Sequence, residues 1–438
     1  MTDETTGPDP VLWQHLLGAR WFAGKGRSAA PGRVHPLAWF RLDDELAVRS
    51  ELVEAVYPDG TSEWYQVLLS YRSAPAEGFL GTLATAPGTE PPLSSRVHVH
   101  DALHDPAALR ALVEVLGTGA EAADWSATIV RPVELSAEAR VFGGEQSNTS
   151  VMIGQSAMVK FFRRLEPGAN LDITIHDALG RAGITSVATL HGWLSANLDG
   201  DQADLAMLVE LLPEARDGWG IATASAAAGD DFTSDAAELG RALADIHLAL
   251  RDTFPTARLQ AGDISAGMRT RLAAAAEEVA ALRPLAPALD ERFAAVGDND
   301  VDGQQVHGDF HLGQTLLTAK GWRIIDFEGE PIKSLAERRA PDSRWRDAAG
   351  MLRSLAYATS ACPDPDSDEA RSWLAETSHA FLDAYVSGFG GGLGELDQEL
   401  LDAYLADKAV YEVVYEARNR PDWIEIPLRA LRDLAGQT

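Results

Sequence analysis

Two nearby stretches decide the fold: Val306-His-Gly-Asp-Phe-His-Leu-Gly-Gln-Thr-Leu-Leu317 and, just beyond it, Arg323-Ile-Ile-Asp-Phe-Glu-Gly-Glu-Pro331. Asp309 follows a His-Gly pair, Gln314 comes five positions later, and Asp326 ends a short apolar run. Phosphoryl transfer from ATP requires one carboxylate that orients the acceptor hydroxyl and takes its proton. It also requires an amide oxygen and a second carboxylate that hold Mg²⁺ against the phosphates. The pattern therefore predicts Asp309 as the base and Gln314 and Asp326 as metal ligands.

The order of these residues matches the His-x-Asp-(four)-Asn and Asp-Phe-Gly loops of kinases, with Gln314 for the Asn and Glu328 for the Gly. Glu328 is a third candidate metal ligand. The alternative is an ordinary β-hairpin with polar turns, since two carboxylates 17 residues apart are unremarkable on their own. A polar loop, an apolar strand pair and the Asp-Phe-Glu-Gly-Glu-Pro turn occur here in the right order, which favours kinase-type chemistry.

Size and charge limit the possible functions. A chain of 438 residues holds two or three domains or lobes, and its 46% hydrophobic and 24% charged residues are typical of a globular protein. The net charge of −29 argues against binding to nucleic acid or to an anionic membrane. The single cysteine, Cys362, excludes an intramolecular disulfide. We find no apolar signal segment and no apolar run of the roughly 20 residues that a membrane span needs, so we expect a soluble, cytoplasmic protein.

The first part of the chain, 1–90, is predicted to form a small α+β unit. A helix over 11–27 runs into Arg20-Trp-Phe-Ala-Gly-Lys-Gly-Arg27, whose glycines and basic residues suggest a phosphate loop. The spacing is not that of a Walker A loop and no strand precedes it, which favours an aromatic anchor instead. The Pro58-Asp-Gly60 turn predicts a hairpin between two of three strand candidates. These strands are 37–42, 47–57 and 62–72.

Residues 91–212 are predicted to complete a nucleotide-binding lobe. The polar turn 145–150 lies between two strands and lacks the Gly-x-Gly-x-x-Gly pattern, but its N–H groups and hydroxyls suit a phosphate. Its candidate nucleotide contacts are Ser147, Asn148 and Thr149. Lys160 stands at an otherwise apolar position of the next strand, where an unpaired ammonium would be costly. In a kinase such a lysine contacts the α- and β-phosphates.

Two further segments belong to this lobe. A helix over 172–180 offers Asp172 and Asp177 as acidic partners for Lys160. The apolar run that ends in Glu210, Leu211 and Leu212 is typical of a buried strand leading into a lobe connection. Adenine would hydrogen-bond the backbone of these three residues, although a plain core strand fits the run equally well.

Residues 213–438 are predicted to form a largely helical lobe. The apolar spacing predicts helices over 234–250 and 268–282. His247, on the first of them, is more readily a structural histidine than a ligand. Asp347 opens a helix behind the predicted catalytic loop, and it is our candidate to hold that loop's backbone, with Asp342 second.

The helix predicted over 396–418 places tyrosines and carboxylates at steps of three or four residues. Tyr411, Glu412 and Tyr415, followed by Trp423, suit a sugar, because aromatic faces cover C–H surface and carboxylates accept hydroxyl groups. Aromatic stripes with this spacing are more often core. The two interpretations are evenly balanced on the residues alone.

Taken together, these residues resemble the actinobacterial maltokinases, relatives of the aminoglycoside phosphotransferases and, more distantly, of protein kinases. The resemblance rests on the two stretches quoted first and on motifs at 20–24, 145–151, 337–343 and 407–423. It implies an α+β, bilobal, protein-kinase-like fold with an N-terminal cap. It also implies ATP and Mg²⁺ as cofactors and conversion of maltose to maltose 1-phosphate, a donor for α-glucan synthesis. An enzyme of that pathway is a candidate partner, which the sequence alone does not establish.

The resemblance also implies residue roles. The base would be Asp309, the phosphate contact Lys160, and the sugar contacts His311, Tyr411, Glu412, Tyr415 and Trp423. Thr174 stands where the family usually has the Glu that pairs with this Lys, which leaves Asp177, one turn on, as a substitute. Glu425 stands where a small or apolar residue is expected, and an acid there suits an ammonium group. The alternative is therefore a glucosamine kinase that makes the 6-phosphate, with maltose the leading acceptor and a non-catalytic scaffold the remote third.

Overall fold

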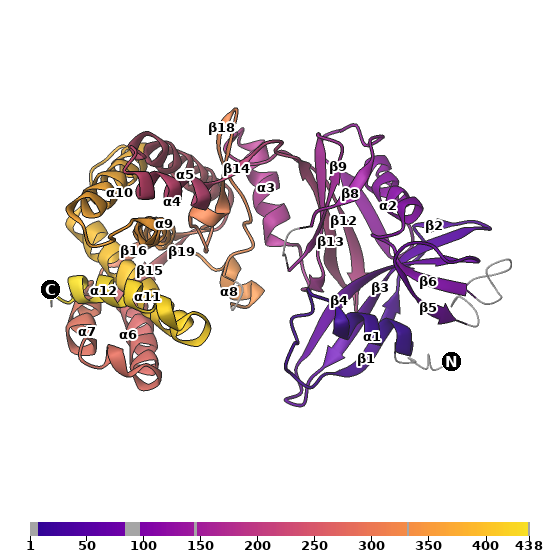
Figure 1. The fold of residues 1–438 in the computed structure, drawn as a ribbon, viewed down its shortest axis with the longest axis horizontal. Coiled ribbons are helices and arrows are strands. Elements are labelled where there is room, and N and C mark those ends of the chain that lie inside the picture. The colour runs from indigo at the N-terminus through magenta and orange to yellow at the C-terminus, as the bar shows by residue number, and fades with distance from the viewer. Residues whose placement is uncertain (1–7, 84–96, 144–146, 331–332, 437–438) are drawn as a thin grey trace. The chain divides into compact units, whose positions relative to one another are not determined.

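The computed structural model describes residues 8–83, 97–143, 147–330 and 333–436, and the chain divides into two compact units (Figure 1). The first unit comprises Met1–Thr174 and Ala188–Pro213, and the second comprises Ile175–Val187 and Glu214–Thr438. The domain boundary predicted at 90 lies outside the described residues, and the one predicted at 212 stands beside the end of the first unit. Both boundaries remain predictions.

The N-terminal part of the first unit is a seven-stranded sheet ordered β1-β3-β4-β6-β5, with β2 beside β3 and β11 beside β4. β3 and β4 pair antiparallel around Pro58-Asp-Gly60, which confirms the predicted hairpin. Helix α1 (Pro10–Gly18) ends earlier than predicted, because Ala19 is extended and Trp21 and Phe22 instead pack on the core of this sheet. The strands are β1 (Ala30–Pro36), β2 (Arg41–Leu42), β3 (Leu46–Val56), β4 (Ser62–Arg72), β5 (Phe79–Leu83), β6 (Val97–Asp101) and β11 (Arg164–Leu165).

The first unit contains a second sheet of six strands, ordered β7-β12-β13-β10-β9-β8. Lys160 lies in β10, opposite Met207 of β13 and Ser150 of β9. Helix α2 (Pro106–Thr118) and both sheets share one hydrophobic core, to which Leu68 and Val159 belong. The strands are β7 (Trp125–Ile129), β8 (Ala139–Val141), β9 (Thr149–Ile153), β10 (Ala157–Phe161), β12 (Leu190–Leu198) and β13 (Asp201–Glu210).

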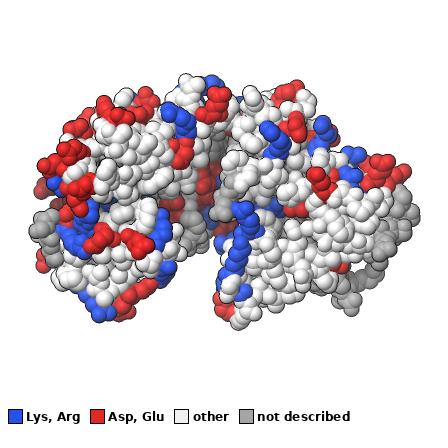
Figure 2. Space-filling view, in the orientation of Figure 1, with Lys and Arg blue, Asp and Glu red and all other residues white. Residues whose placement is uncertain are grey.

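The second unit is mainly helical, and in it α5 packs along α10 while α9 packs along α11 (Figure 1). In Figure 2 acidic side chains gather on the surface formed by α10, whose exposed carboxylates include Asp368, Glu369 and Glu376. The α-helices are α3 (Leu171–Arg181, which begins in the first unit), α4 (Gly218–Ala228), α5 (Thr233–Thr253), α6 (Ala261–Glu278), α7 (Ala286–Ala295), α8 (Leu335–Arg339), α9 (Trp345–Ala358), α10 (Asp368–Gly388), α11 (Glu395–Asn419) and α12 (Glu425–Leu434). The 3₁₀ helices are η1 (Ala280–Leu282), η2 (Leu312–Gln314), η3 (Thr359–Ala361) and η4 (Pro421–Trp423).

Two small sheets in the second unit frame the predicted catalytic segment. One contains β14 (Arg216–Asp217), β17 (Thr315–Thr318) and β18 (Gly321–Ile324), and the other contains β15 (Ala257–Gln260), β16 (Asp300–Gln304) and β19 (Asp342–Ser343). The antiparallel β17–β18 hairpin confirms the apolar strand pair of the motif. In the described part of the chain, no helix has both the length and the apolar character needed to cross a membrane.

Candidate active site

The segment between β16 and β17 is held by a buried carboxylate. Asp347, in the first turn of α9, accepts hydrogen bonds from the backbone N–H groups of His307 (2.7 Å) and Gly308 (2.8 Å). Nε2 of His247 lies 2.9 Å from the same carboxylate, and both side chains are fully buried. Burial alone would raise the pKa of Asp347, but His247 and the loop outweigh it and hold that pKa below its usual range. Asp347 therefore fixes the loop, and His247 is structural.

Helix α9 supports the same loop farther along. A Cβ built on Gly350 would lie 2.5 Å from the backbone oxygen of Phe310, so the helix can approach this closely only at a glycine. One turn on, Oγ of Ser354 accepts a hydrogen bond from the N–H of Leu312 at 3.1 Å. Asp347, Gly350 and Ser354 share one face of α9 because they are three and four residues apart. That face shapes the loop from one end to the other.

Asp309, the predicted base, lies beside a lysine and a histidine. Its Oδ1 lies 3.4 Å from Nζ of Lys408 on α11, and its Oδ2 lies 3.8 Å from Nε2 of His311, a separation longer than a hydrogen bond. Burial alone would raise the pKa of Asp309, but the interactions with His311 and Lys408 outweigh it and hold that pKa well below its usual range. Asp309 is therefore ionised at neutral pH and able to accept a proton.

The loop after β18 brings the predicted metal ligands together. Nε2 of Gln314 donates to Oδ2 of Asp326 at 3.2 Å, and carboxylate oxygens of Asp326 and Glu328 lie within 4.8 Å of each other. Nε2 of His307 lies 3.0 Å from the backbone oxygen of Ile325, which ties this loop to the first. Mg²⁺ prefers oxygen donors. Two carboxylates fit that preference, as does the Gln314 amide after a half-turn about its last bond.

The backbone of Asp326 is strained. Its φ of 68° lies in the left-handed region, which is costly for a residue other than glycine. Such residues gather at functional sites, where the surrounding structure holds them in place. The strain agrees with a carboxylate that is aimed for binding.

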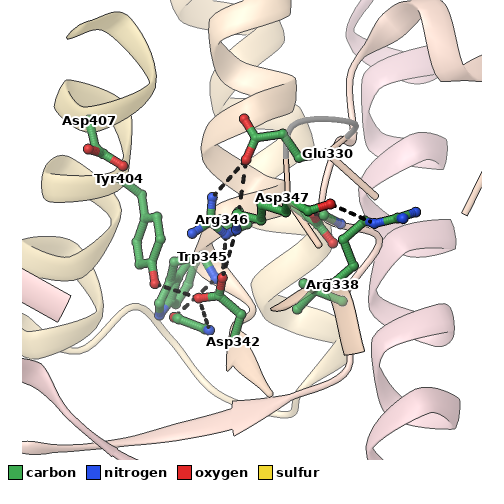
Figure 3. A network of polar contacts seen from close by, with 12 residues as sticks. Glu330, Arg338, Asp342, Trp345, Arg346, Asp347, Tyr404 and Asp407 are labelled. Carbon is green, nitrogen blue, oxygen red and sulfur yellow. Dashed lines mark hydrogen bonds and ion pairs between the residues drawn. The ribbon is translucent and has the colours of Figure 1, made fainter. Parts of the chain in front are cut away.

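A pocket of about 160 Å³ opens beside Asp309 within the second unit. Charged side chains in its lining include Glu330, Lys333, Asp407 and Lys408. Figure 3 shows part of the network behind it, in which Asp342 accepts hydrogen bonds from Tyr404 (2.8 Å) and from Arg346. The pocket therefore combines charged side chains with the aromatic rings of Phe310, Tyr404 and Tyr411.

The residues predicted to contact a sugar are unevenly placed. Tyr411 lines the pocket, and its ring stacks on that of exposed Tyr415 with centroids 6.4 Å apart. The carboxylate of Glu412 accepts two hydrogen bonds from Arg353, at 2.9 and 2.6 Å. Glu412 is therefore already engaged. The two tyrosine rings are partly exposed, and Lys408 and Arg420 lie over them at 5.3 and 5.4 Å from the ring centroids.

Trp423 and Glu425 do not line this pocket. The guanidinium of Arg420 lies 4.9 Å from the Trp423 ring centroid and covers one of its faces. Glu425 is exposed and pairs with Arg432 at 3.1 Å on the same helix. The charge of Glu425, predicted to meet an ammonium group, is thus met by the chain itself.

In the first unit, Lys160 pairs with Asp172. Their Nζ and Oδ2 atoms lie 3.0 Å apart, with the lysine side chain 17% exposed and the aspartate 3%. Asp177, the substitute suggested at sequence level, pairs with Arg181 at 2.7 Å. Oγ1 of Thr174 donates to the backbone oxygen of Asn170 at 2.7 Å. The acidic partner therefore stands half a turn earlier than the family pattern indicates.

The side chains of Asn148 and Thr149 are used within the protein. Oγ1 of Thr149 accepts from Nε of Arg163 at 2.8 Å, and Oδ1 of Asn148 accepts from the Arg163 N–H at 3.2 Å. Arg163 is almost fully buried, and its guanidinium lies 4.6 Å from the ring of Trp21. Burial lowers the pKa of Arg163 to about 10 despite the charge of Asp101. Arg163 thus shapes the polar turn that the sequence assigned to nucleotide binding, and Trp21 has the anchoring role that was favoured for it.

The backbone donors of the predicted adenine segment are partly taken. The N–H of Glu210 donates to the oxygen of Thr189 at 2.8 Å, and the N–H of Leu211 donates to the oxygen of Ser156 at 3.1 Å. Leu212 is the remaining donor candidate of the three predicted residues. Ser147, at the other predicted edge, is exposed.

Two family profiles match the chain: the Maltokinase N-terminal cap domain over residues 15–105 and the Phosphotransferase enzyme family over residues 138–329. The glucosamine kinase of Streptacidiphilus jiangxiensis is 31% identical over 318 residues, which cover 66% of this chain and 72% of that protein. The chain belongs to this phosphotransferase family. The family resemblance inferred from the sequence motifs is thereby confirmed. The enzyme is a kinase of this family that carries an N-terminal cap domain.

Two further comparisons agree with this. The glucosamine kinase of Mycolicibacterium smegmatis (strain ATCC 700084 / mc(2)155) is 28% identical over 317 residues, covering 66% of the kinase and 77% of that protein. A solved structure of a glucosamine kinase in complex with glucosamine, ADP and inorganic phosphate matches with a TM-score of 0.70 at 24% identity, covering 98% of the kinase and 100% of that chain. The predicted kinase-like fold with an N-terminal cap is therefore confirmed.

Several residues of the site were not found from the sequence. Lys408 belongs to no recognised motif, and its pairing with Asp309 joins positions 99 residues apart. Arg163 and Lys333 carried no motif signal. For Lys408, the usable signal is a lysine three positions before Tyr411, on a helix whose spacing otherwise brings tyrosines and carboxylates together.

Proposed function

We propose that the kinase transfers the γ-phosphoryl group of ATP to glucosamine and produces glucosamine 6-phosphate. The observation that carries this proposal is the pocket of about 160 Å³ beside the ionised Asp309. Ligand pockets for drug-sized molecules measure roughly 300–1,000 Å³, so this one suits a single sugar ring better than a disaccharide. The names of the two relatives support the same substrate class.

In this reaction Asp309 accepts the proton of the attacking hydroxyl. Its lowered pKa keeps it ionised, and Asp347 keeps its loop in place through His307 and Gly308. A carboxylate with so low a pKa is a weak base, so its main contribution is to orient the hydroxyl and to take the proton late, as the new bond to phosphorus forms. Lys408 balances the charge of Asp309 until that proton arrives.

The amino group of the sugar needs a carboxylate in the same pocket. Asp407 is engaged by Arg271, with two hydrogen bonds of 2.9 and 2.8 Å. Glu330 is less committed, since its nearest cations are Lys333 at 3.7 Å and Arg346 at 4.0 Å, beyond hydrogen-bond distance. We therefore assign the ammonium group to Glu330 rather than to Glu425.

ATP would be bound through the first unit. Lys160, held by Asp172, offers an ammonium group to the α- and β-phosphates, and Ser147 offers a hydroxyl. The N–H of Leu212 is the proposed donor to adenine. Mg²⁺, held by Gln314, Asp326 and Glu328, would neutralise phosphate charge.

Maltose is the second candidate acceptor, because of the stacked pair of Tyr411 and Tyr415 beside the pocket. Tyr411 is 37% exposed and Tyr415 43%, so their rings offer apolar surface to a second glucose ring. Under this alternative the first ring would enter the pocket and the second would lie on the tyrosines. The product would be maltose 1-phosphate.

The deciding experiment measures ADP release with ATP and Mg²⁺ on glucosamine, maltose, glucose and an aminoglycoside, and identifies the product by ³¹P NMR. A 6-phosphate on glucosamine with maltose inert supports the proposal. An anomeric phosphate on maltose replaces it with the second candidate. Glu330→Gln should raise the glucosamine KM about tenfold or more, since a charged hydrogen bond is lost, and should leave the glucose KM unchanged. Glu425→Ala is the matched control, with no change in either KM.

A further inference from the structure

Four cationic side chains are found among the described residues that line the pocket beside Asp309, and three of them are paired at hydrogen-bond distance. Arg271 pairs with Asp407, and Lys408 lies 3.4 Å from Asp309. Arg346 donates to Asp342 (Figure 3), which lies behind the pocket lining. These three charges are therefore satisfied within the protein.

Lys333 is the exception among the described residues that line this pocket. Its Nζ lies 3.7 Å from Glu330 and 3.9 Å from Asp342, so neither carboxylate reaches hydrogen-bond distance. The side chain is 27% exposed, and it lines the pocket together with Asp309. An ammonium group has three N–H donors, and here they have no close acceptor among these charged groups.

The surroundings of Lys333 disfavour its charge. Burial is the main cause that lowers its pKa, and the charge of Arg346 lowers it further, while Asp342 and Glu330 compensate only in part. An anion bound beside Lys333 would favour the charged ammonium form and raise this pKa. The contrast with Lys408 is direct, because Asp309 and Glu330 raise the pKa of Lys408 in spite of its burial.

We propose that Lys333 binds the phosphate group of the sugar phosphate in the pocket beside Asp309. This rests on the proposed function, in which the phosphoryl group becomes bonded to the hydroxyl that Asp309 deprotonates. In a pocket of about 160 Å³, a phosphate on that oxygen lies among the lining side chains. Lys408 is occupied by Asp309, so Lys333 is the cation left to receive it. An amino group that pairs with Glu330 would loosen the hold of Glu330 on Lys333 at the same time.

The test compares binding of glucosamine, glucosamine 6-phosphate and inorganic phosphate to the full chain by calorimetry. In Lys333→Met, which keeps the length of the side chain, the affinity for glucosamine 6-phosphate should fall roughly tenfold to a hundredfold, the usual loss for a charged hydrogen bond. The affinity for glucosamine should change less than twofold. Lys333→Arg should retain most of the phosphate affinity, and Lys320→Met, at an exposed lysine of the β17–β18 turn, is the matched control with wild-type values for all three.

The results separate this proposal from the proposed function. Unchanged affinity of Lys333→Met for glucosamine 6-phosphate overturns the proposal, as does an equal loss of glucosamine affinity, which would indicate a merely structural role. If the wild type phosphorylates no amino sugar but binds inorganic phosphate in a Lys333-dependent way, the anion site stands and the glucosamine assignment fails. If glucuronate binds in a Lys333-dependent way and glucosamine 6-phosphate does not, the anion belongs to an acidic acceptor and the product-phosphate assignment is wrong.

Discussion

Nζ of Lys408 lies 3.4 Å from Oδ1 of Asp309, so a cation on α11 meets the carboxylate of a loop that precedes it by 99 residues. The pairing sets the protonation of the base. Lys408 also lines the pocket next to Tyr411, whose ring centroid is 5.3 Å from Nζ. One helix therefore supplies both the cation beside the proposed base and the tyrosine of the proposed sugar surface.

Removing that cation should move the acidic side of the pH–rate profile. The pKa of Asp309 is lowered in the folded protein, so the base is ionised above that pKa and lost as the pH falls through it. In Lys408→Met the pKa rises toward its usual range, and the acidic limb of kcat should shift to higher pH. Lys408→Arg should keep the limb near its wild-type position. A limb that stays in place in Lys408→Met would mean that His311 alone sets the pKa.

Replacing the base should separate chemistry from nucleotide binding. Asp309→Asn keeps the size of the side chain but cannot take a proton, so turnover should fall by a factor of about 10² to 10⁴. ATP affinity, measured by calorimetry, should change less than twofold, because the proposed nucleotide contacts, Lys160, Ser147 and Leu212, do not include Asp309. A large loss of ATP affinity would show that the role assigned to Asp309 is wrong.

The close approach of α9 to the catalytic loop should make Gly350 sensitive to one methyl group. Gly350→Ala places Cβ against the backbone oxygen of Phe310, and overpacking of this kind typically costs about 1–3 kcal/mol. We expect a lower melting temperature and a lower kcat, because the loop that carries Asp309 is displaced. Gly180→Ala, also at a helical glycine but with open space around the new Cβ, should be neutral or stabilising by up to about 1 kcal/mol. Equal melting temperatures for the two variants would contradict the packing argument.

The support of the polar turn by Arg163 can be tested at its acceptor. Thr149→Val removes the hydroxyl oxygen that lies 2.8 Å from Nε and preserves the shape of the side chain. A buried charged donor then loses a partner, at a cost of about 1.5–3 kcal/mol of unfolding free energy. If the turn contacts the phosphates, the KM for ATP should rise severalfold while the KM for the sugar stays constant. Thr174→Val, whose hydroxyl donates to the backbone oxygen of Asn170 one turn earlier, serves as the comparison and should leave both KM values unchanged.

The parts of this site that could be predicted are those in which the chemistry is local in sequence. The order of residues along the chain predicts the loop around Asp309 and the β17–β18 hairpin. It also predicts the role of Asp347 at the start of the helix that follows. The buried Asp172–Lys160 pair was only half predicted, since two acids of α3 were equally acceptable by composition. In the structure Lys160 pairs with Asp172, whereas Asp177, more than one helical turn farther along α3, pairs with Arg181.

The parts that could not be predicted depend on contacts between distant segments. Asp309 with Lys408 and Asp342 with Tyr404 join positions 99 and 62 residues apart, and nothing in either neighbourhood specifies the pairing. For Glu412 the sequence predicted a ligand contact where the structure has a contact within the protein. Its spacing on α11 suited a sugar contact, but Arg353, 59 residues earlier, already occupies its carboxylate. Helical periodicity predicts on which face of a helix a side chain lies, but it does not predict which residue or ligand that side chain contacts.

The pairing of β11 with β4 bears on how enzymes of this kind diversify. Arg164 and Leu165, which follow the strand of Lys160, complete the cap's sheet opposite Tyr65 and Trp64. The cap therefore contains a strand from the chain segment that directly follows β10, so residues 15–105 alone do not form the complete cap sheet. A chimera that takes residues 15–105 from a relative must also take the segment after Lys160. Otherwise β4 loses its β11 partner, and buried Arg163 loses its contact with the ring of Trp21. The cap and the sheet that carries Lys160 should consequently be inherited together, while the proposed sugar contacts of α11 remain free to change.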